Sequence, residues 1–160
     1  MNFTGIGEER EWPLANACAT QALGAELART LCRDGGHTLL LSGELGAGKT
    51  CLVQGLARGL GIDDVVTSPT FALSQHYQGS HGALVHLDLY RLEQPEAADE
   101  LLAQEQEIAR GIHALLAVEW PERLSGLPAH SWCVDLRLLD PRDPDRGRLA
   151  RIRPPAALPG

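Results

Sequence analysis

The residues that most constrain this chain are Gly43-Glu44-Leu45-Gly46-Ala47-Gly48-Lys49-Thr50, which match the phosphate-loop pattern GxxxxGK(S/T). The apolar run Thr38–Leu41 precedes the loop, and an amphipathic segment begins at Lys49. In such a strand–loop–helix unit, backbone N–H groups and the helix N-terminus bind phosphates, lysine neutralises them, and the threonine hydroxyl ligates magnesium. We therefore predict that residues 43–50, with Cys51 in the next position, bind a magnesium-nucleotide.

Lysine occurs only once in the chain, at position 49, although 14 residues are basic. A compact ammonium on a flexible stem can reach phosphate oxygens that the broad planar fork of arginine would not fit. The single lysine therefore supports a phosphate-binding role for Lys49.

The bulk composition indicates one compact cytoplasmic domain. A chain of 160 residues that is 44% hydrophobic can bury one core, and residues 1–12 and 154–160 are expected to be flexible ends. A net charge of −7 argues against direct nucleic-acid binding. We find no signal peptide and no apolar run near the roughly 20 residues that a membrane helix needs. The four scattered cysteines are expected to be reduced, small buried hydrophobes.

The order of elements predicts an α/β fold. Asn16 is a suitable cap for a helix that carries leucine at every fourth position up to residue 31. Further helices are expected from Lys49 and from Pro95, and strands at Thr38–Leu41, Ala83–Leu89 and Ala114–Val118, while 65–73 is expected to be loop or extended. Trp132–Leu139 and Arg148–Arg153 predict an antiparallel hairpin. Together these elements indicate a P-loop NTPase-like, mainly parallel sheet flanked by helices, with a C-terminal antiparallel hairpin.

Two acids follow apolar strands at the edge of the sheet where the phosphate loop begins. Asp88 ends one predicted strand and Glu119 ends the next. Ligands of open α/β sheets bind beyond the carboxyl ends of the strands, so both acids are candidates for holding magnesium or polarising an attacking water. Asp88 is the better metal-side candidate, and Glu119 is catalytic or a second metal-side ligand. The alternative is that Asp88 forms a turn and Glu119 satisfies N–H groups beside Trp120-Pro121.

Other polar residues near these strands have less specific patterns. His86 shares a strand face with Asp88, and we interpret it as a packed, hydrogen-bonded histidine rather than a catalyst. Thr67, Ser68 and Thr70 surround Pro69, where a rigid turn could act as a switch-like loop that senses the outer phosphate. An ordinary Ser/Thr turn explains this segment equally well.

Four motifs in order resemble the TsaE (YjeE) family. They are Gly-Glu-Leu-Gly-Ala-Gly-Lys-Thr (43–50), Ser-Pro-Thr-Phe (68–71), His-Leu-Asp-Leu-Tyr-Arg (86–91) and Glu-Trp-Pro (119–121). The resemblance covers about residues 13–121, and the predicted hairpin fits the family's architecture. One departure is a segment between Pro95 and Glu119 that is a few residues longer than usual and lacks an expected glycine.

The resemblance implies a small bacterial P-loop ATPase required for threonylcarbamoyladenosine modification of tRNA. Such a protein acts with the partner proteins TsaB and TsaD and does not itself transfer the threonylcarbamoyl group. Because the chain is acidic, we expect it to reach tRNA only indirectly, through these partners. ATP and Mg²⁺ are the implied cofactors.

The resemblance also implies roles for individual residues. Lys49 and Thr50 bind phosphate and magnesium, Asp88 takes a Walker-B-like role, and Glu119 acts at the metal or in hydrolysis. The remaining implied positions are the switch-like loop of Thr67, Ser68 and Thr70, and Trp120 near the nucleotide or partner surface.

Two alternatives remain open. A small-molecule P-loop kinase needs an arginine-bearing lid, for which residues 142–153 are the candidate segment, although they are predicted to form a hairpin. A non-hydrolysing, nucleotide-gated assembly module would use the same loop without turnover. A GTPase is disfavoured because the only asparagines are Asn2 and Asn16, so no Asn-Lys-x-Asp guanine-recognition motif exists.

Overall fold

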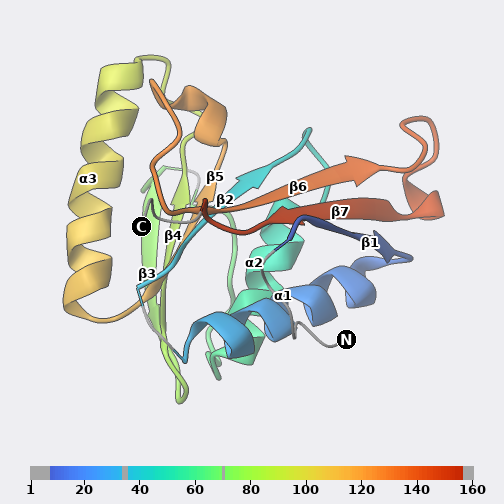
Figure 1. Cartoon of the computed structure of the whole chain (residues 1–160), viewed down its shortest axis with the longest axis horizontal. Coiled ribbons are helices and arrows are strands. Elements are labelled where there is room, and N and C mark those ends of the chain that lie inside the picture. The colour runs from blue at the N-terminus through green and yellow to red at the C-terminus, as the bar shows by residue number, and fades with distance from the viewer. Residues whose placement is uncertain (1–7, 34–35, 70, 157–160) are drawn as a thin grey trace.

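The computed structural model describes residues 8–33, 36–69 and 71–156. Its strands form one seven-stranded sheet in the order β1-β7-β6-β2-β5-β4-β3 (Figure 1). The strands are β1 (Arg10–Leu14), β2 (Thr38–Ser42), β3 (Ser74–Gln78), β4 (Ala83–Asp88), β5 (Leu115–Glu119), β6 (Trp132–Leu138) and β7 (Arg148–Arg153). The helices are α1 (Ala17–Leu31), α2 (Lys49–Gly59) and α3 (Pro95–Gly111), with short 3-10 turns η1 (Pro121–Arg123) and η2 (Pro144–Arg146).

The centre of the sheet is parallel and its flanks are antiparallel. Strand β2 pairs in parallel with β5 and β6, and β5 pairs in parallel with β4. Strands β6 and β7 form the predicted antiparallel hairpin. The P-loop NTPase-like α/β fold expected from the sequence is therefore confirmed.

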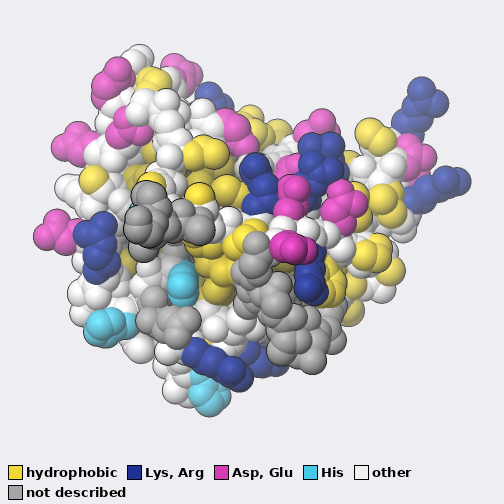
Figure 2. Space-filling view, in the orientation of Figure 1, with side chains coloured by type: hydrophobic (Ala, Val, Ile, Leu, Met, Phe, Trp, Pro, Cys, Tyr) yellow, Lys and Arg dark blue, Asp and Glu magenta, His cyan; other side chains and the backbone are white. Residues whose placement is uncertain are grey.

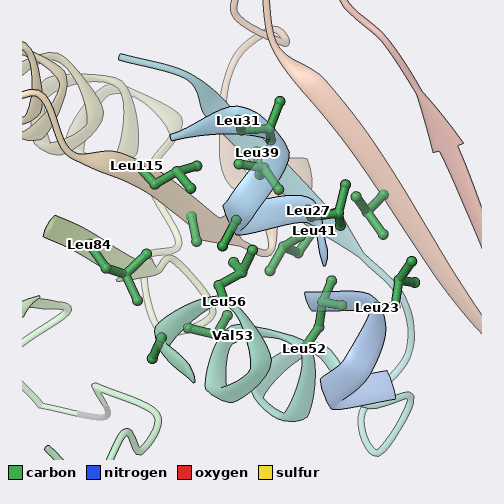
Figure 3. Close-up of a cluster of buried hydrophobic side chains, with 14 of the residues drawn as sticks. Leu23, Leu27, Leu31, Leu39, Leu41, Leu52, Val53, Leu56, Leu84 and Leu115 are labelled. Atoms are coloured by element: carbon green, nitrogen blue, oxygen red, sulfur yellow. The ribbon is translucent and has the colours of Figure 1, made fainter. Parts of the chain in front are cut away.

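Helices cover both faces of the sheet. Alternate residues of β2 face opposite sides: Leu39 and Leu41 pack with α1 and α2, whereas Leu40 packs in the core beneath α3. Figure 3 shows the first of these cores, where leucines from α1, α2 and β2 point toward one another. Burial on both faces explains why most residues of β2, β4 and β5 are apolar.

Helices α1 and α2 approach each other closely through glycine. A Cβ atom built on Gly55 would lie 2.2 Å from the backbone oxygen of Gln21, and one built on Gly24 would lie 2.3 Å from that of Leu52. Asn16 begins α1 as predicted, because its side chain accepts a hydrogen bond from the Ala19 N–H at 2.9 Å. The helix that follows the phosphate loop is thus held by backbone-to-backbone packing.

Two edge strands are not predicted by the sequence. The expectation of a flexible segment over residues 1–12 is wrong for residues 10–12, since β1 pairs with β7 and buries Leu14. Residues 1–7 and 157–160 lie outside the described ranges. Strand β3 reads Ser-Gln-His-Tyr-Gln, and only Tyr77 is buried. Such polar segments become strands because a neighbouring strand offers free backbone groups, which local periodicity does not reveal.

The expectation that the cysteines are buried is wrong. Cys18 is exposed, and Cys32, Cys51 and Cys133 are half-buried. Among the described helices, none is long and apolar enough to cross a membrane.

Candidate active site

The phosphate loop joins β2 to α2 through three glycines with left-handed backbone. Gly43, Gly46 and Gly48 have φ values of 147°, 81° and 105°, which residues with a Cβ atom rarely adopt. Gly48 is the N-cap of α2 and supplies no side-chain cap. The N–H groups of the first helical turn therefore remain available for phosphate oxygens.

Lys49 lies buried at the centre of the site. Its ammonium donates a hydrogen bond to the backbone carbonyl of Gly43 and lies 3.6 Å from the centroid of the Trp120 ring. Burial lowers the pKa of Lys49 below its ordinary value, and the carboxylates of Glu119, Glu122 and Asp88 partly oppose that shift. The charge is thus held in a partly desolvated position beside acceptors that a phosphate can replace.

Glu119 lies between a histidine and the threonine of the phosphate loop. Oγ1 of Thr50 donates toward both carboxylate oxygens, at 3.3 and 3.2 Å. The ring Nε2 of His86 lies 2.5 Å from Oε2. Only 3% of Glu119 and none of His86 is exposed. These contacts hold the Glu119 carboxylate in one orientation next to the threonine hydroxyl.

Asp88 occupies the neighbouring position on the same edge. Its Cα is paired with that of Glu119 across β4 and β5. Oδ2 accepts a hydrogen bond from the Ser68 hydroxyl at 2.7 Å, and Oδ1 accepts one from the Tyr90 N–H at 3.0 Å. The turn-forming role weighed for Asp88 is therefore present, and the carboxylate also lines the cleft.

The switch-like loop contributes one hydroxyl to the site. Ser68 lines the cleft and contacts Asp88. Thr67 is exposed and does not line it, and Thr70 lies outside the described residues. Of the two predicted hydroxyl residues that the structure describes, Ser68 lies with the acids and Thr67 does not.

Aromatic side chains form one wall of the cleft. Trp120 adopts a left-handed backbone conformation with φ 61°, and its ring lies 4.8 Å from that of Tyr90. The guanidinium of Arg91 lies 4.6 Å from the Phe71 ring. The cleft has a volume of about 460 Å³ and is lined by Leu45, Gly46, Gly48, Lys49, Thr50, Cys51, Ser68, Asp88, Tyr90, Arg91, Glu119 and Trp120. Gly43, Glu44 and Ala47 do not line it, although Gly43 binds Lys49.

The oxygen-rich side chains of the cleft fit magnesium. Thr50, Asp88 and Glu119 present hydroxyl and carboxylate oxygens, the hard donors that Mg²⁺ prefers. Within the described ranges, no group of three or more His, Cys, Asp or Glu residues could hold a metal ion by itself. One hydroxyl and two carboxylates suit Mg²⁺, because this ion commonly binds through one or two carboxylates together with waters and substrate phosphates.

Two residues make contacts with the site that the sequence analysis did not predict. His86 is packed and hydrogen-bonded as interpreted, but its partner is the candidate catalytic acid Glu119. Arg148, in the predicted hairpin, donates hydrogen bonds to the loop carbonyls of Gly46 and Ala47. Because side chains alternate along β4, His86 lies on the same face as Asp88, and this spacing could have predicted that the histidine is near the site. No local pattern indicates Arg148.

Comparison with known proteins shows which family the chain resembles. Residues 14–147 match the family model described as "Threonylcarbamoyl adenosine biosynthesis protein TsaE". This match covers most of the chain and includes all four motifs. The chain belongs to the TsaE family. The resemblance noted in the sequence is therefore confirmed.

Individual relatives agree with this assignment. The chain is 46% identical over 122 residues to the tRNA threonylcarbamoyladenosine biosynthesis protein TsaE of Synechocystis, covering 74% of each protein. It is 35% identical over 113 residues to TsaE of Bacillus subtilis, covering 71% of this chain and 67% of the relative. A crystal structure of Bacillus subtilis YdiB superposes with a TM-score of 0.69 at 26% identity, covering 93% of this chain and 87% of that one. The sequence relatives and the structural neighbour therefore agree with membership of the TsaE family.

Proposed function

We propose that this protein is a cytoplasmic, magnesium-dependent ATP hydrolase that serves threonylcarbamoyladenosine biosynthesis on tRNA together with proteins of the TsaB and TsaD type. Membership of the TsaE family supports the pathway. The observation that carries the hydrolase proposal is the contact of the buried Glu119 carboxylate with Thr50 of the phosphate loop. A fixed carboxylate at that position can act on magnesium-bound water or on the attacking water.

Different residues of the cleft bind the phosphates and the magnesium ion. The N–H groups at the start of α2 receive phosphate oxygens, and Lys49 moves its ammonium from the Gly43 carbonyl to the outer phosphates. Thr50 and one or both acids would hold Mg²⁺, which would neutralise charge on the phosphates. Trp120, above the Lys49 ammonium, excludes water from that side of the cleft.

Hydrolysis then requires a group that orients water. Glu119 is held by Thr50 and His86, whereas Asp88 is held by Ser68 and the Tyr90 N–H. Positioned carboxylates of this kind orient a nucleophile and accept its proton. We assign Glu119 to hydrolysis or to metal-bound water, and Asp88 to the metal side.

Charge supports indirect access to tRNA. The chain carries a net charge of −7. Figure 2 shows basic side chains near β6 and β7 interspersed with acidic ones. Arg137 pairs with Asp135 of β6, and Arg151 pairs with Glu11 of β1. Arg153 pairs with Glu9, which precedes β1. Proteins that track phosphate backbones use clustered, unpaired basic residues. The partner proteins therefore supply the contact with tRNA.

The test is phosphate release from Mg-ATP by the purified protein, alone and with its cognate TsaB- and TsaD-type proteins. We expect slow release alone, stimulation by the pair, and loss of release in Glu119→Ala. Transfer of phosphate to a metabolite would identify a kinase instead. ATP-dependent assembly with the pair and no phosphate release would identify a non-hydrolysing module.

A further inference from the structure

Arg148 links the C-terminal hairpin to the phosphate loop. It is the first residue of β7, about a hundred positions after the loop. Its guanidinium donates to three backbone carbonyls: Nη2 to Gly46 at 3.1 Å, Nε to Ala47 at 3.3 Å and Nη1 to Pro144 at 2.5 Å. A planar group with five N–H donors can make such contacts together, which an ammonium cannot do with the same geometry.

The guanidinium contacts the loop from outside the phosphate cleft. Arg148 does not line that cleft, and instead borders a separate hollow with Thr20, Cys51 and Pro144. Gly48 borders both spaces. Arg148 therefore reaches the loop backbone from outside the cleft that we assign to the phosphates.

The bonded carbonyls determine where the loop N–H groups point. In a trans peptide the C=O and N–H point in opposite directions, and no peptide bond among the described residues is cis. The carbonyls of Gly46 and Ala47 share their peptide groups with the N–H groups of Ala47 and Gly48. The Ala47 N–H closes the turn by donating to the Glu44 carbonyl at 3.0 Å. The Gly48 N–H is directed away from Arg148, and Gly48 lines the cleft.

The loop needs such an external restraint. Gly46 and Gly48 have positive φ values, and a Cβ on Gly46 would meet no atom within 4 Å. Glycine has the largest conformational freedom to lose on ordering, so a free loop would lose that entropy on binding phosphates. A restraint that orders the loop beforehand strengthens phosphate binding.

We propose that Arg148 is a positioning residue that holds the phosphate loop in the conformation that receives the nucleotide phosphates. The inference rests on the proposed nucleotide binding. The match to the family model covers residues 14–147 and ends one position before Arg148.

The test compares Mg-ATP affinity of the full chain and its variants by calorimetry. Arg148→Ala should weaken binding about tenfold, as expected for loss of hydrogen bonds to a charged group. Arg148→Lys should recover part of the affinity. Arg146→Ala is the matched control, because this exposed arginine of the same turn pairs with Asp143, at 3.6 Å, and not with the phosphate loop. It should bind as the parent does.

A structural role would give a different result from a positioning role. Millimolar guanidinium chloride should restore Mg-ATP affinity to Arg148→Ala and leave the parent unchanged. At saturating ATP the kcat should be retained while the KM rises. Unchanged affinity in Arg148→Ala would overturn the inference, as would weakened affinity with a lowered Tm and no rescue. Failure of the parent to bind Mg-ATP would instead refute the proposed function.

Discussion

The ring Nε2 of His86 lies 2.5 Å from the carboxylate Oε2 of Glu119, and both side chains are buried. Nδ1 of His86 is buried without a hydrogen-bond partner in the described part of the chain. A proton on Nδ1 would therefore be unsatisfied, whereas a proton on Nε2 can be donated to Glu119. The histidine thus fixes the orientation of the acid that we assign to hydrolysis.

Replacement of His86 should lower turnover more than binding. His86→Leu removes the donor to Glu119, and we expect kcat for ATP hydrolysis, measured with the partner proteins, to fall at least about tenfold. His86→Gln can present an amide N–H from a similar position and should recover part of the rate. Equal kcat values in the parent and His86→Leu would show that the contact does not matter for hydrolysis.

Asp88→Asn should weaken the dependence on magnesium while the fold is retained. The amide oxygen can still accept from the Tyr90 N–H, but the charge that attracts Mg²⁺ is lost. We expect the Mg²⁺ concentration for half-maximal activity to rise about tenfold or more. Ser68→Ala is the control, because it removes only the hydroxyl bonded to Asp88. An unchanged Mg²⁺ requirement in Asp88→Asn would argue against a metal-side role.

Lys49→Met should abolish nucleotide binding without lowering the stability of the fold. The lowered pKa of Lys49 means that folding disfavours its charge, so this group costs stability below its folded pKa. That cost disappears as the pH rises above the ordinary lysine pKa of 10.5. The variant, measured at pH 7 without nucleotide, should therefore have an equal or higher Tm, and calorimetry should detect no ATP binding. A clearly lower Tm would show that the contacts with Gly43 and Trp120 outweigh desolvation.

Gly55→Ala should destabilise the fold by about 2 kcal/mol, since the added methyl would overlap the Gln21 backbone of α1. Thermal unfolding should show a Tm lower by about 4–8 °C. Gly111→Ala, at the end of α3, is the matched control because nothing lies within 4 Å of its Cβ position. It should be neutral or stabilising by up to about 1 kcal/mol. Equal effects of the two substitutions would contradict close helix packing.

The link between α3 and the segment after η1 should depend on acid pH. Hydrogen bonds from the Ser125 side chain and backbone lower the pKa of Asp99 below 3.8. The stability that this link provides is present above pH 3.8 and is lost as the pH falls through the folded pKa. In Ser125→Ala, the pKa of Asp99 measured by NMR titration should rise toward its ordinary value. A pKa that does not move would assign the shift to another cause.

Much of the site could be predicted because it follows from local pattern. The glycine spacing of residues 43–50 encodes a turn into a helix N-terminus, which is a short-range property of the backbone. Apolar runs that end in Asp88 and Glu119 place both acids at one edge, because parallel strands share the same carboxyl end. Thr67, in contrast, is exposed and does not line the cleft, which the local pattern does not reveal.

The sequence by itself determined the phosphate loop, the helix capped by Asn16 and the strands whose ends carry the acids. These features depend on periodicity and on residues a few positions apart. Only the tertiary structure decided that His86 orients Glu119, that Arg148 bonds the loop, and that β1 and β3 extend the sheet. Such contacts join segments far apart in the chain, and hydrogen-bonding groups find these partners only after the core has brought the segments together.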